Sequence, residues 1–353
     1  VHPAIKAMNL LDYDIATLGN HEFNYGLEFL DEVYNDAKFD FVNANVYIDD
    51  KDGNPNNDQN KYRPYKIVNK KVKDQSGKTK VVKIGYIGFV PPQINEWDKA
   101  HLDGKVITKD ITKTAEKYIP MMKKKGADVI VAMAHSGFSS NEQNTEDTIY
   151  ALSKVKGIDA LTFSHTHKVF PAADVSKLDA LFKDENGNVL PGVDNEKGTI
   201  NGVPAVQAGF GGGSLGIIDL TLEKKKGKWS VTDSQSSTRA VTSDVEPNRA
   251  IVKAVTKDHE ATIDYVNTPI GTTTDDIYSY FALVKDDPSI QVVTNAQTWY
   301  AENYIKLNKP ELADIPILSA GAPFKAGRNG VEEFTEIKKG DLTIRSAADL
   351  YLY

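Results

Sequence analysis

The sequence predicts a layered α/β domain, followed by a helix and part of a second α/β domain. In the first 160 residues, short apolar runs alternate with amphipathic ones, as the strands of a central sheet alternate with the helices that cover it. A stretch rich in Gly and Asn, a hairpin pattern and a long run with helical spacing come next, which indicate strands, turns and a domain boundary. The length of 353 residues suits two domains of about 150 residues each.

The elements of the first domain follow from where apolar periodicity starts and stops. Helices are expected where apolar residues recur every three to four positions, and strands where a short apolar run ends at a polar turn. In chain order we expect a helix through Ile5, Met8 and Leu11, a strand at 14–19, a helix at 26–35, strands at 40–46 and 80–90, a helix at 111–125, strands at 127–135 and 158–163, and a hairpin at 216–235.

A helical face marks the domain boundary. Ile251, Val255 and Ile263 recur near one face of a helix, after a polar stretch. We therefore predict a first domain at 1–245, a linking helix at 246–267 and part of a second domain at 268–353. Both chain ends fall inside expected elements, so we expect the natural N-terminus to lie upstream.

Composition excludes several classes of function. A net charge of -7 and a pI near 5.6 argue against a protein that neutralises a nucleic-acid backbone. The chain has no cysteine, so it offers neither disulfides nor a thiolate nucleophile or ligand. No apolar run approaches the roughly 20 residues that a membrane span requires.

Polar side chains gather in three turns that each follow an expected strand. The turns read "GNHE" with Asn20 and His21, "AHSG" with His135, and "SHTH" with His165 and His167. Loops at the carboxyl ends of strands form the ligand crevice of an α/β sheet, so the three turns are expected to converge.

These residue types suit divalent metal ions. Imidazole nitrogen and amide oxygen bind Mn, Fe, Zn or Co, and side chains of an H-x-H pair on an extended segment point apart, which suits two ions better than one. Two ions can clamp the attacking and leaving oxygens of a phosphoryl group. Taken singly, His135 could be a turn residue that only forms a hydrogen bond. Asn20 could be the N-cap of a helix, with Glu22 in the first turn of that helix. Together the turns predict a metal site.

The motifs resemble those of a known family. "GNHEFNYG", "AHSG" and "SHTH" look like motifs of the calcineurin-like metallophosphoesterases, whose fold is a β-sandwich flanked by helices. More narrowly, "GYIGFVPPQINEWD", "ILSAGAPFKAGRNG" and "RSAADLYLY" are similar to the bacterial 2′,3′-cyclic-nucleotide 2′-phosphodiesterase/3′-nucleotidase branch of the 5′-nucleotidase family. The resemblance implies a linker helix, part of an α/β 5′-nucleotidase C-terminal domain, and hydrolysis of 2′,3′-cyclic nucleotides to 3′-nucleotides and then to nucleoside and phosphate.

The resemblance also implies roles for single residues. Asn20, His135 and His165 would bind one divalent ion and His167 a second. His21 would face the phosphate and stabilise charge or protonate the leaving oxygen. A metal-activated water would be the nucleophile.

The second domain would bind the nucleoside. Lys325 and Arg328 lie in the loop that the family uses for phosphate and sugar, and Tyr353 stands where it places the first of two aromatics around the base. Without the resemblance, Lys325 and Arg328 would be interpreted as exposed turn residues, and Tyr353 as a strand or core residue.

The chain departs from the family pattern at three points. The Asp-x-His and Gly-Asp motifs would lie upstream of Val1, so we expect this segment alone to be inactive or weakly metallated.

Asn24 replaces the Asp that pairs with the catalytic His in the 5′-nucleotidase branch. An amide can orient His21 but cannot stabilise imidazolium by charge. Ser164 replaces a Gly, at a cost of about 1 kcal/mol if the backbone there needs positive φ.

Two alternatives stay open at this point. One is a 5′-nucleotidase or UDP-sugar hydrolase, and the other is a non-catalytic surface protein that binds nucleotide or metal. We expect a monomer that acts on nucleotides outside the cytoplasm, and we expect the other histidines, His2, His101 and His259, at the surface. The run "GFGGGSLG" is expected to form a tight turn near the site, because no helix or Gly-Lys-Ser/Thr follows it.

Overall fold

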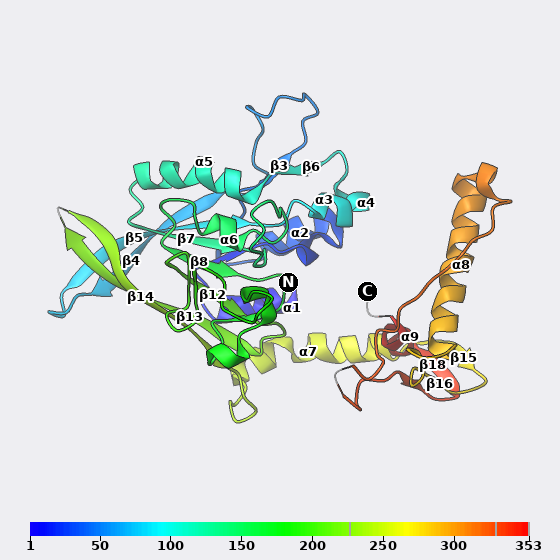
Figure 1. The fold of residues 1–353 in the computed structure, drawn as a ribbon. Coiled ribbons are helices and arrows are strands. Elements are labelled where there is room, and N and C mark those ends of the chain that lie inside the picture. The colour runs from blue at the N-terminus through cyan, green and yellow to red at the C-terminus, as the bar shows by residue number, and fades with distance from the viewer. Residues whose placement is uncertain (226, 329, 352–353) are drawn as a thin grey trace. The chain divides into compact units, whose positions relative to one another are not determined.

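The computed structural model describes residues 1–225, 227–328 and 330–351, and the chain divides into two compact units, Val1–Ala254 and Val255–Tyr353 (Figure 1). The division falls inside helix α7 (Arg249–Val266). This helix lies within the range expected for the linking helix, whose limits and role stay predictions.

An eight-stranded sheet organises the first unit. Its order is β10-β11-β12-β8-β7-β5-β4, with β9 paired to β12. The four strands β5, β7, β8 and β12 run parallel to one another, so their carboxyl ends share one edge. The strands of this sheet are β4 (Tyr65–Lys73), β5 (Thr79–Phe89), β7 (Val129–Ala134), β8 (Ala160–Phe163), β9 (Val169–Phe170), β10 (Val193–Asp194), β11 (Thr199–Ile200) and β12 (Val203–Ala208).

Helix α5 (Ile111–Lys124) covers one face of this sheet, as the ribbon shows (Figure 1). It begins at Asp110, whose carboxylate accepts a hydrogen bond from the Lys113 N–H at 2.7 Å, a favourable N-cap. Its apolar stripe packs into the main core, with Ile119 and Met122 fully buried there.

A second, smaller cluster of buried residues surrounds the first turn. Leu18, Phe23, Ile94 and Leu102 are fully buried in it. The elements that supply this cluster are α1 (Pro3–Leu10), β1 (Ile15–Thr17), η1 (His21–Phe23), α2 (Gly26–Asn35), β2 (Asp40–Val42), β3 (Val46–Ile48), α3 (Ile94–Trp97), α4 (Lys99–Leu102) and β6 (Val106–Thr108).

The parallel pair β1–β2 lies against β5 at a point where only glycine fits. A Cβ on Gly88 would stand 2.0 Å from the Val42 carbonyl oxygen and 2.3 Å from Thr17 Oγ1. The missing side chain therefore lets the strand that leads into the first turn approach the main sheet.

The remaining elements of the first unit follow the third turn or connect strands. They are α6 (Ile149–Leu152), η2 (Val175–Lys177), η3 (Ala180–Phe182) and the long hairpin of β13 (Ser214–Lys225) with β14 (Lys228–Ala240).

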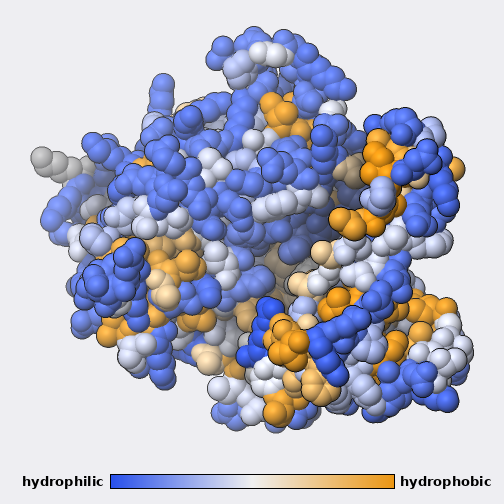
Figure 2. All heavy atoms as spheres, turned by 45° about the vertical axis from the view of Figure 1, so that its right-hand side comes forward, coloured by the Kyte–Doolittle hydropathy of each residue, from blue (hydrophilic) through white to orange (hydrophobic). Residues whose placement is uncertain are grey.

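The second unit has two short antiparallel pairs, β15–β18 and β16–β17, and a long helix, α8. Several large apolar residues remain exposed on α8, among them Trp299 and Leu307. The face in Figure 2 likewise shows hydrophobic patches within a mainly hydrophilic surface. The elements are β15 (Pro269–Thr273), β16 (Ile277–Tyr278), α8 (Pro288–Asn308), η4 (Pro310–Leu312), β17 (Glu336–Ile337), β18 (Gly340–Thr343) and α9 (Ile344–Leu350).

The mixed α/β class expected from the sequence is confirmed, and the expected helices at 26–35 and 111–125 correspond to α2 and α5. In the described parts of the chain, no helix is both long enough and apolar enough to cross a membrane.

Gly88→Ala is expected to lower the free energy of unfolding by about 1–3 kcal/mol, because the added methyl group overpacks the contact with β2. Urea denaturation measures the change. Gly213→Ala is the matched control, since its Cβ would stand 3.4 Å from its nearest neighbour. Equal stability of the two variants would contradict the close approach.

Candidate metal centre

The first and second turns meet because Gly19 has no side chain. A Cβ on Gly19 would stand 2.6 Å from His135 Nδ1 and 2.9 Å from Glu22 Oε2. Glu22 in turn accepts a hydrogen bond from the Gly19 N–H at 2.5 Å. Glu22 thus closes the first turn, which brings the turn against His135.

Asn20 faces His135 instead of capping a helix. It stands at the N-cap position of η1 but makes no capping hydrogen bond. Its Oδ1 lies 2.7 Å from His135 Nε2. The two atoms that the resemblance implies as ligands of one ion therefore lie close together.

The second and third turns are adjacent because β7 and β8 pair in register, with Ala134 opposite Phe163. The next residues along the two strands are His135 and Ser164, and Ser164 Oγ lies 3.0 Å from His135 Nδ1. While Nε2 donates to Asn20 Oδ1, Nδ1 accepts from the Ser164 hydroxyl; with a metal on Nε2 the proton would sit on Nδ1 and the same hydroxyl would accept it. Ser164 therefore suits the orientation of His135 as a ligand.

The strain considered for Ser164 does not arise. Positive φ falls on His165 (73°) and His167 (59°), and Ser164 is not among the described residues that adopt it. The third turn is held by Gln207, whose Nε2 donates to the Ser164 carbonyl at 3.0 Å and to Thr166 Oγ1 at 2.9 Å. This support stabilises the two left-handed histidines.

His165 lies beside His135, with ring centroids 5.3 Å apart. Its Nε2 lies 2.8 Å from Glu146 Oε1, which leaves Nδ1 as the nitrogen for a metal. Trp97 stacks on the His165 ring, with the two centroids 5.6 Å apart. The sequence analysis missed the roles of Glu146 and Trp97, although Trp97 belongs to the quoted "INEWD" motif.

His167 is exposed and stacks on Phe210, at 5.4 Å between centroids. Phe210 stands between Gly209 and Gly211, both at positive φ. The glycine-rich run is thus a tight turn next to the third turn, as expected.

The electrostatics keep His135 neutral. Burial, followed by the nearby His165, His21 and His167, lowers the pKa of His135 to about 4. A neutral imidazole is the form that binds a metal. His165, His21 and His167, the other three histidines of the turns, therefore each lie close enough to His135 to act on it. The other histidines, His2, His101 and His259, are exposed as expected.

His21 Nδ1 lies 2.8 Å from Asn24 Oδ1, the pairing expected from the motif. Asn24 Nδ2 in turn donates to Asp98 Oδ1 at 2.9 Å. Asp98 comes directly after α3, 74 residues further along the chain, and its contact with Asn24 was not expected from the sequence.

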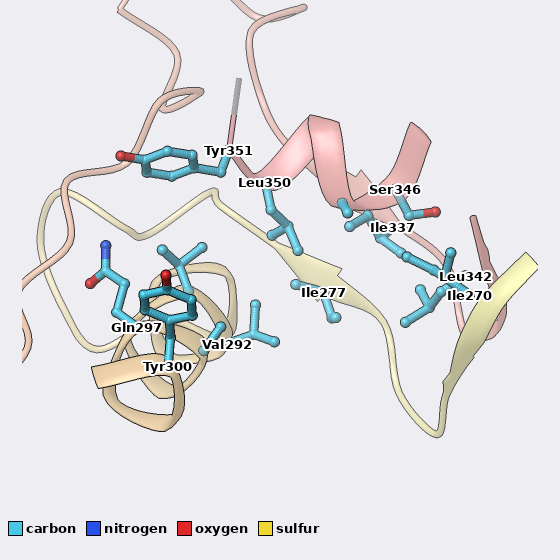
Figure 3. A pocket seen from close by; sticks show the side chains of 13 residues that line it. Ile270, Ile277, Val292, Gln297, Tyr300, Ile337, Leu342, Ser346, Leu350 and Tyr351 are labelled. Carbon is cyan, nitrogen blue, oxygen red and sulfur yellow. The ribbon is translucent and has the colours of Figure 1, made fainter. Parts of the chain in front are cut away.

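The second unit contains an apolar cavity of about 850 Å³, shown in Figure 3. Gln297 and Tyr300 from α8 lie at the same end of it as Tyr351. Among the described residues that line the cavity there is no lysine or arginine.

The expected substrate residues of the second unit lie elsewhere or outside the description. Lys325 forms an ion pair with Asp349 of α9, and Arg328 is exposed. Tyr353 lies outside the described residues. Their roles in binding nucleotide stay predictions.

This fold, with three polar turns that meet at one edge of its sheet, is that of a phosphoesterase domain, and comparison with known proteins agrees. The calcineurin-like phosphoesterase family model matches residues 3–169. The crystal structure of calcineurin-like phosphoesterase YfkN from Bacillus subtilis is 42% identical, with a TM-score of 0.68 over 76% of each chain. The chain belongs to the calcineurin-like phosphoesterases.

Two further relatives match the whole chain. The 2′,3′-cyclic-nucleotide 2′-phosphodiesterase/3′-nucleotidase of Yersinia enterocolitica is 47% identical over 363 residues, which cover 53% of that protein. The trifunctional nucleotide phosphoesterase protein YfkN of Bacillus subtilis is 48% identical over 357 residues, or 23% of its length. The resemblance drawn from the motifs is confirmed, and the chain spans about half the length, or less, of these relatives.

The free energy of unfolding of the metal-free protein should fall as the pH drops from 6.5 toward 4. In this window the unfolded chain protonates His135, whereas the folded protein keeps it neutral. At about 1.4 kcal/mol per pKa unit, the loss is about 3 kcal/mol at most. Urea denaturation at pH 7.5 and pH 5 measures it. The His135→Gln variant should lose less stability over the same range, and an equal loss would contradict the assignment.

Ser164→Ala is expected to weaken Mn²⁺ binding about tenfold, the lower end of the effect of removing a group that orients a ligand. Ser164→Thr keeps the hydroxyl and should bind nearly as the wild type does. Isothermal titration calorimetry gives the affinities, with the exposed Ser176→Ala as control. Unchanged affinity in Ser164→Ala would show that the hydroxyl does not orient His135.

Proposed function

We propose that this chain carries the phosphoesterase centre of an enzyme that hydrolyses 2′,3′-cyclic nucleotides to 3′-nucleotides, and then 3′-nucleotides to nucleoside and phosphate. The observation that carries the proposal is the convergence of Asn20 Oδ1 and His135 Nε2, 2.7 Å apart, next to the pair of His21 and Asn24. The names of the relatives support the substrate class.

The donor atoms fit divalent ions. Asn20, His135 and His165 offer one amide oxygen and two imidazoles, which suit borderline metals, and His135 is neutral at ordinary pH because its pKa is lowered. We propose that they hold one ion and that His167 holds a second; Mn, Zn, Fe and Co all suit the donors. Bound there, the ions would polarise the phosphoryl group and activate water.

The protein side chains then have separate tasks. Ser164 and Glu146 orient the rings of His135 and His165. His21 is exposed and bonded to Asn24 through Nδ1, which leaves Nε2 to stabilise charge on the phosphate or to give a proton to the leaving oxygen. The second unit would bind the nucleoside.

Asn24 supports the cyclic-phosphodiesterase assignment over a 5′-nucleotidase. The amide bonds His21 without placing a carboxylate on it, in line with the "GNHEFN" motif. We therefore expect 2′,3′-cyclic AMP to be hydrolysed in preference to 5′-AMP.

His21→Ala is expected to lower kcat for 2′,3′-cyclic AMP by about 10²–10⁴-fold, the usual contribution of a general acid or base. KM and Mn²⁺ affinity should stay close to the wild-type values, because His21 is not a proposed ligand. Phosphate release and calorimetry measure the two effects.

The exposed His259→Ala serves as control. The 353-residue chain and the protein expressed from its full reading frame should both be assayed. If both forms bind nucleotide and neither hydrolyses it, the result contradicts an enzyme and favours a binding protein.

A further inference from the structure

A buried carboxylate next to the proposed centre has no role in the metal site described above. Asp98 is 8% exposed, although a carboxylate is costly to bury. It stands at the N-cap position of α4 but its side chain makes no capping hydrogen bond. Its Oδ2 is buried without a hydrogen-bond partner, and its Oδ1 accepts from Asn24 Nδ2 at 2.9 Å.

The backbone of Asp98 is firmly placed. Its N–H donates to the Ile94 carbonyl at 2.9 Å, and its carbonyl accepts from the Leu102 N–H at 3.0 Å. Ile94 and Leu102 are both fully buried in the smaller core. The carboxylate is therefore presented to Asn24 from a rigid support.

This contact decides which way the Asn24 amide points. An ionised carboxylate only accepts hydrogen bonds, so the NH₂ group of Asn24 must face Asp98 and its Oδ1 must face His21. Because Oδ1 also only accepts, His21 Nδ1 must donate to it. The contact thus selects the tautomer of His21 with hydrogen on Nδ1, and Nε2 becomes the nitrogen available to the reaction.

We propose that Asp98 is a positioning residue that acts through Asn24 to hold His21 in the Nδ1–H tautomer and in one orientation. The inference rests on the proposed function for its kinetic consequence, but not for its structural one. The resemblance implies a carboxylate directly on this histidine in a 5′-nucleotidase; here the carboxylate of Asp98 lies one hydrogen bond further away, with a neutral amide between.

An exchange of the two side chains tests this arrangement. In Asp98→Asn, the new side-chain amide can either donate or accept, so it no longer fixes the orientation of the Asn24 amide. His21 should then show both tautomers, and kcat should fall about tenfold with KM unchanged. In Asn24→Asp, two carboxylates would stand within hydrogen-bond distance, which is unfavourable, and kcat should fall as well. In the double variant, the carboxylate at position 24 accepts from His21 and from the new amide at position 98, so tautomer and kcat should return close to the wild type.

Long-range ¹H–¹⁵N spectra of the metal-free protein report the tautomer of neutral His21 without any need for catalysis. They therefore decide the proposal even if the protein does not hydrolyse nucleotides. Asp103→Asn is the matched control, because Asp103 is exposed and ends the same short helix, α4. It should change neither readout.

The proposal is overturned if Asp98→Asn leaves the His21 tautomer unchanged, or if the double variant is no better than the two single variants. Should Asp98→Asn fail to fold by circular dichroism, Asn24→Ala takes its place, since Asn24 is exposed. That variant should show mixed tautomers of His21, and a single retained tautomer would overturn the proposal.

Discussion

The candidate centre depends on the parallel, in-register pairing of β7 with β8. That pairing sets Ala134 opposite Phe163, so the next residues, His135 and Ser164, lie side by side at the sheet edge. The hydroxyl of Ser164 can then bond His135 Nδ1, which turns Nε2 toward Asn20. A shift of one residue would send these side chains to opposite faces, and the second and third turns would no longer share a site.

Close backbone approach is the second constraint. Gly88 lets β2 lie against β5, and Gly19 lets the first turn lie against His135. Both positions lack a left-handed backbone in the structure, so the absence of a side chain, not conformational freedom, is what they contribute. The site is therefore assembled by tight packing of strands and turns, which restricts the positions of its polar groups.

The electrostatic balance of the site follows from this packing. Burial, and then the charges of three nearby histidines, depresses the pKa of His135. A neutral His135 is the form that can bind a cation. Asp98 adds a carboxylate on the side of His21, but Asn24 separates the two, so orientation is transmitted without a direct charge.

Much of this could be predicted from the sequence, because the signals are local. Strand and helix periods, the polar turns after strands, and the group of Asn20, His135, His165 and His167 are all visible in short windows. The tertiary structure alone decided the rest. Positive φ falls on the histidines and not on Ser164, while Glu146 and Asp98 orient their partners from distant parts of the chain. Such contacts depend on how loops pack in space, and no periodicity or spacing in the sequence encodes them.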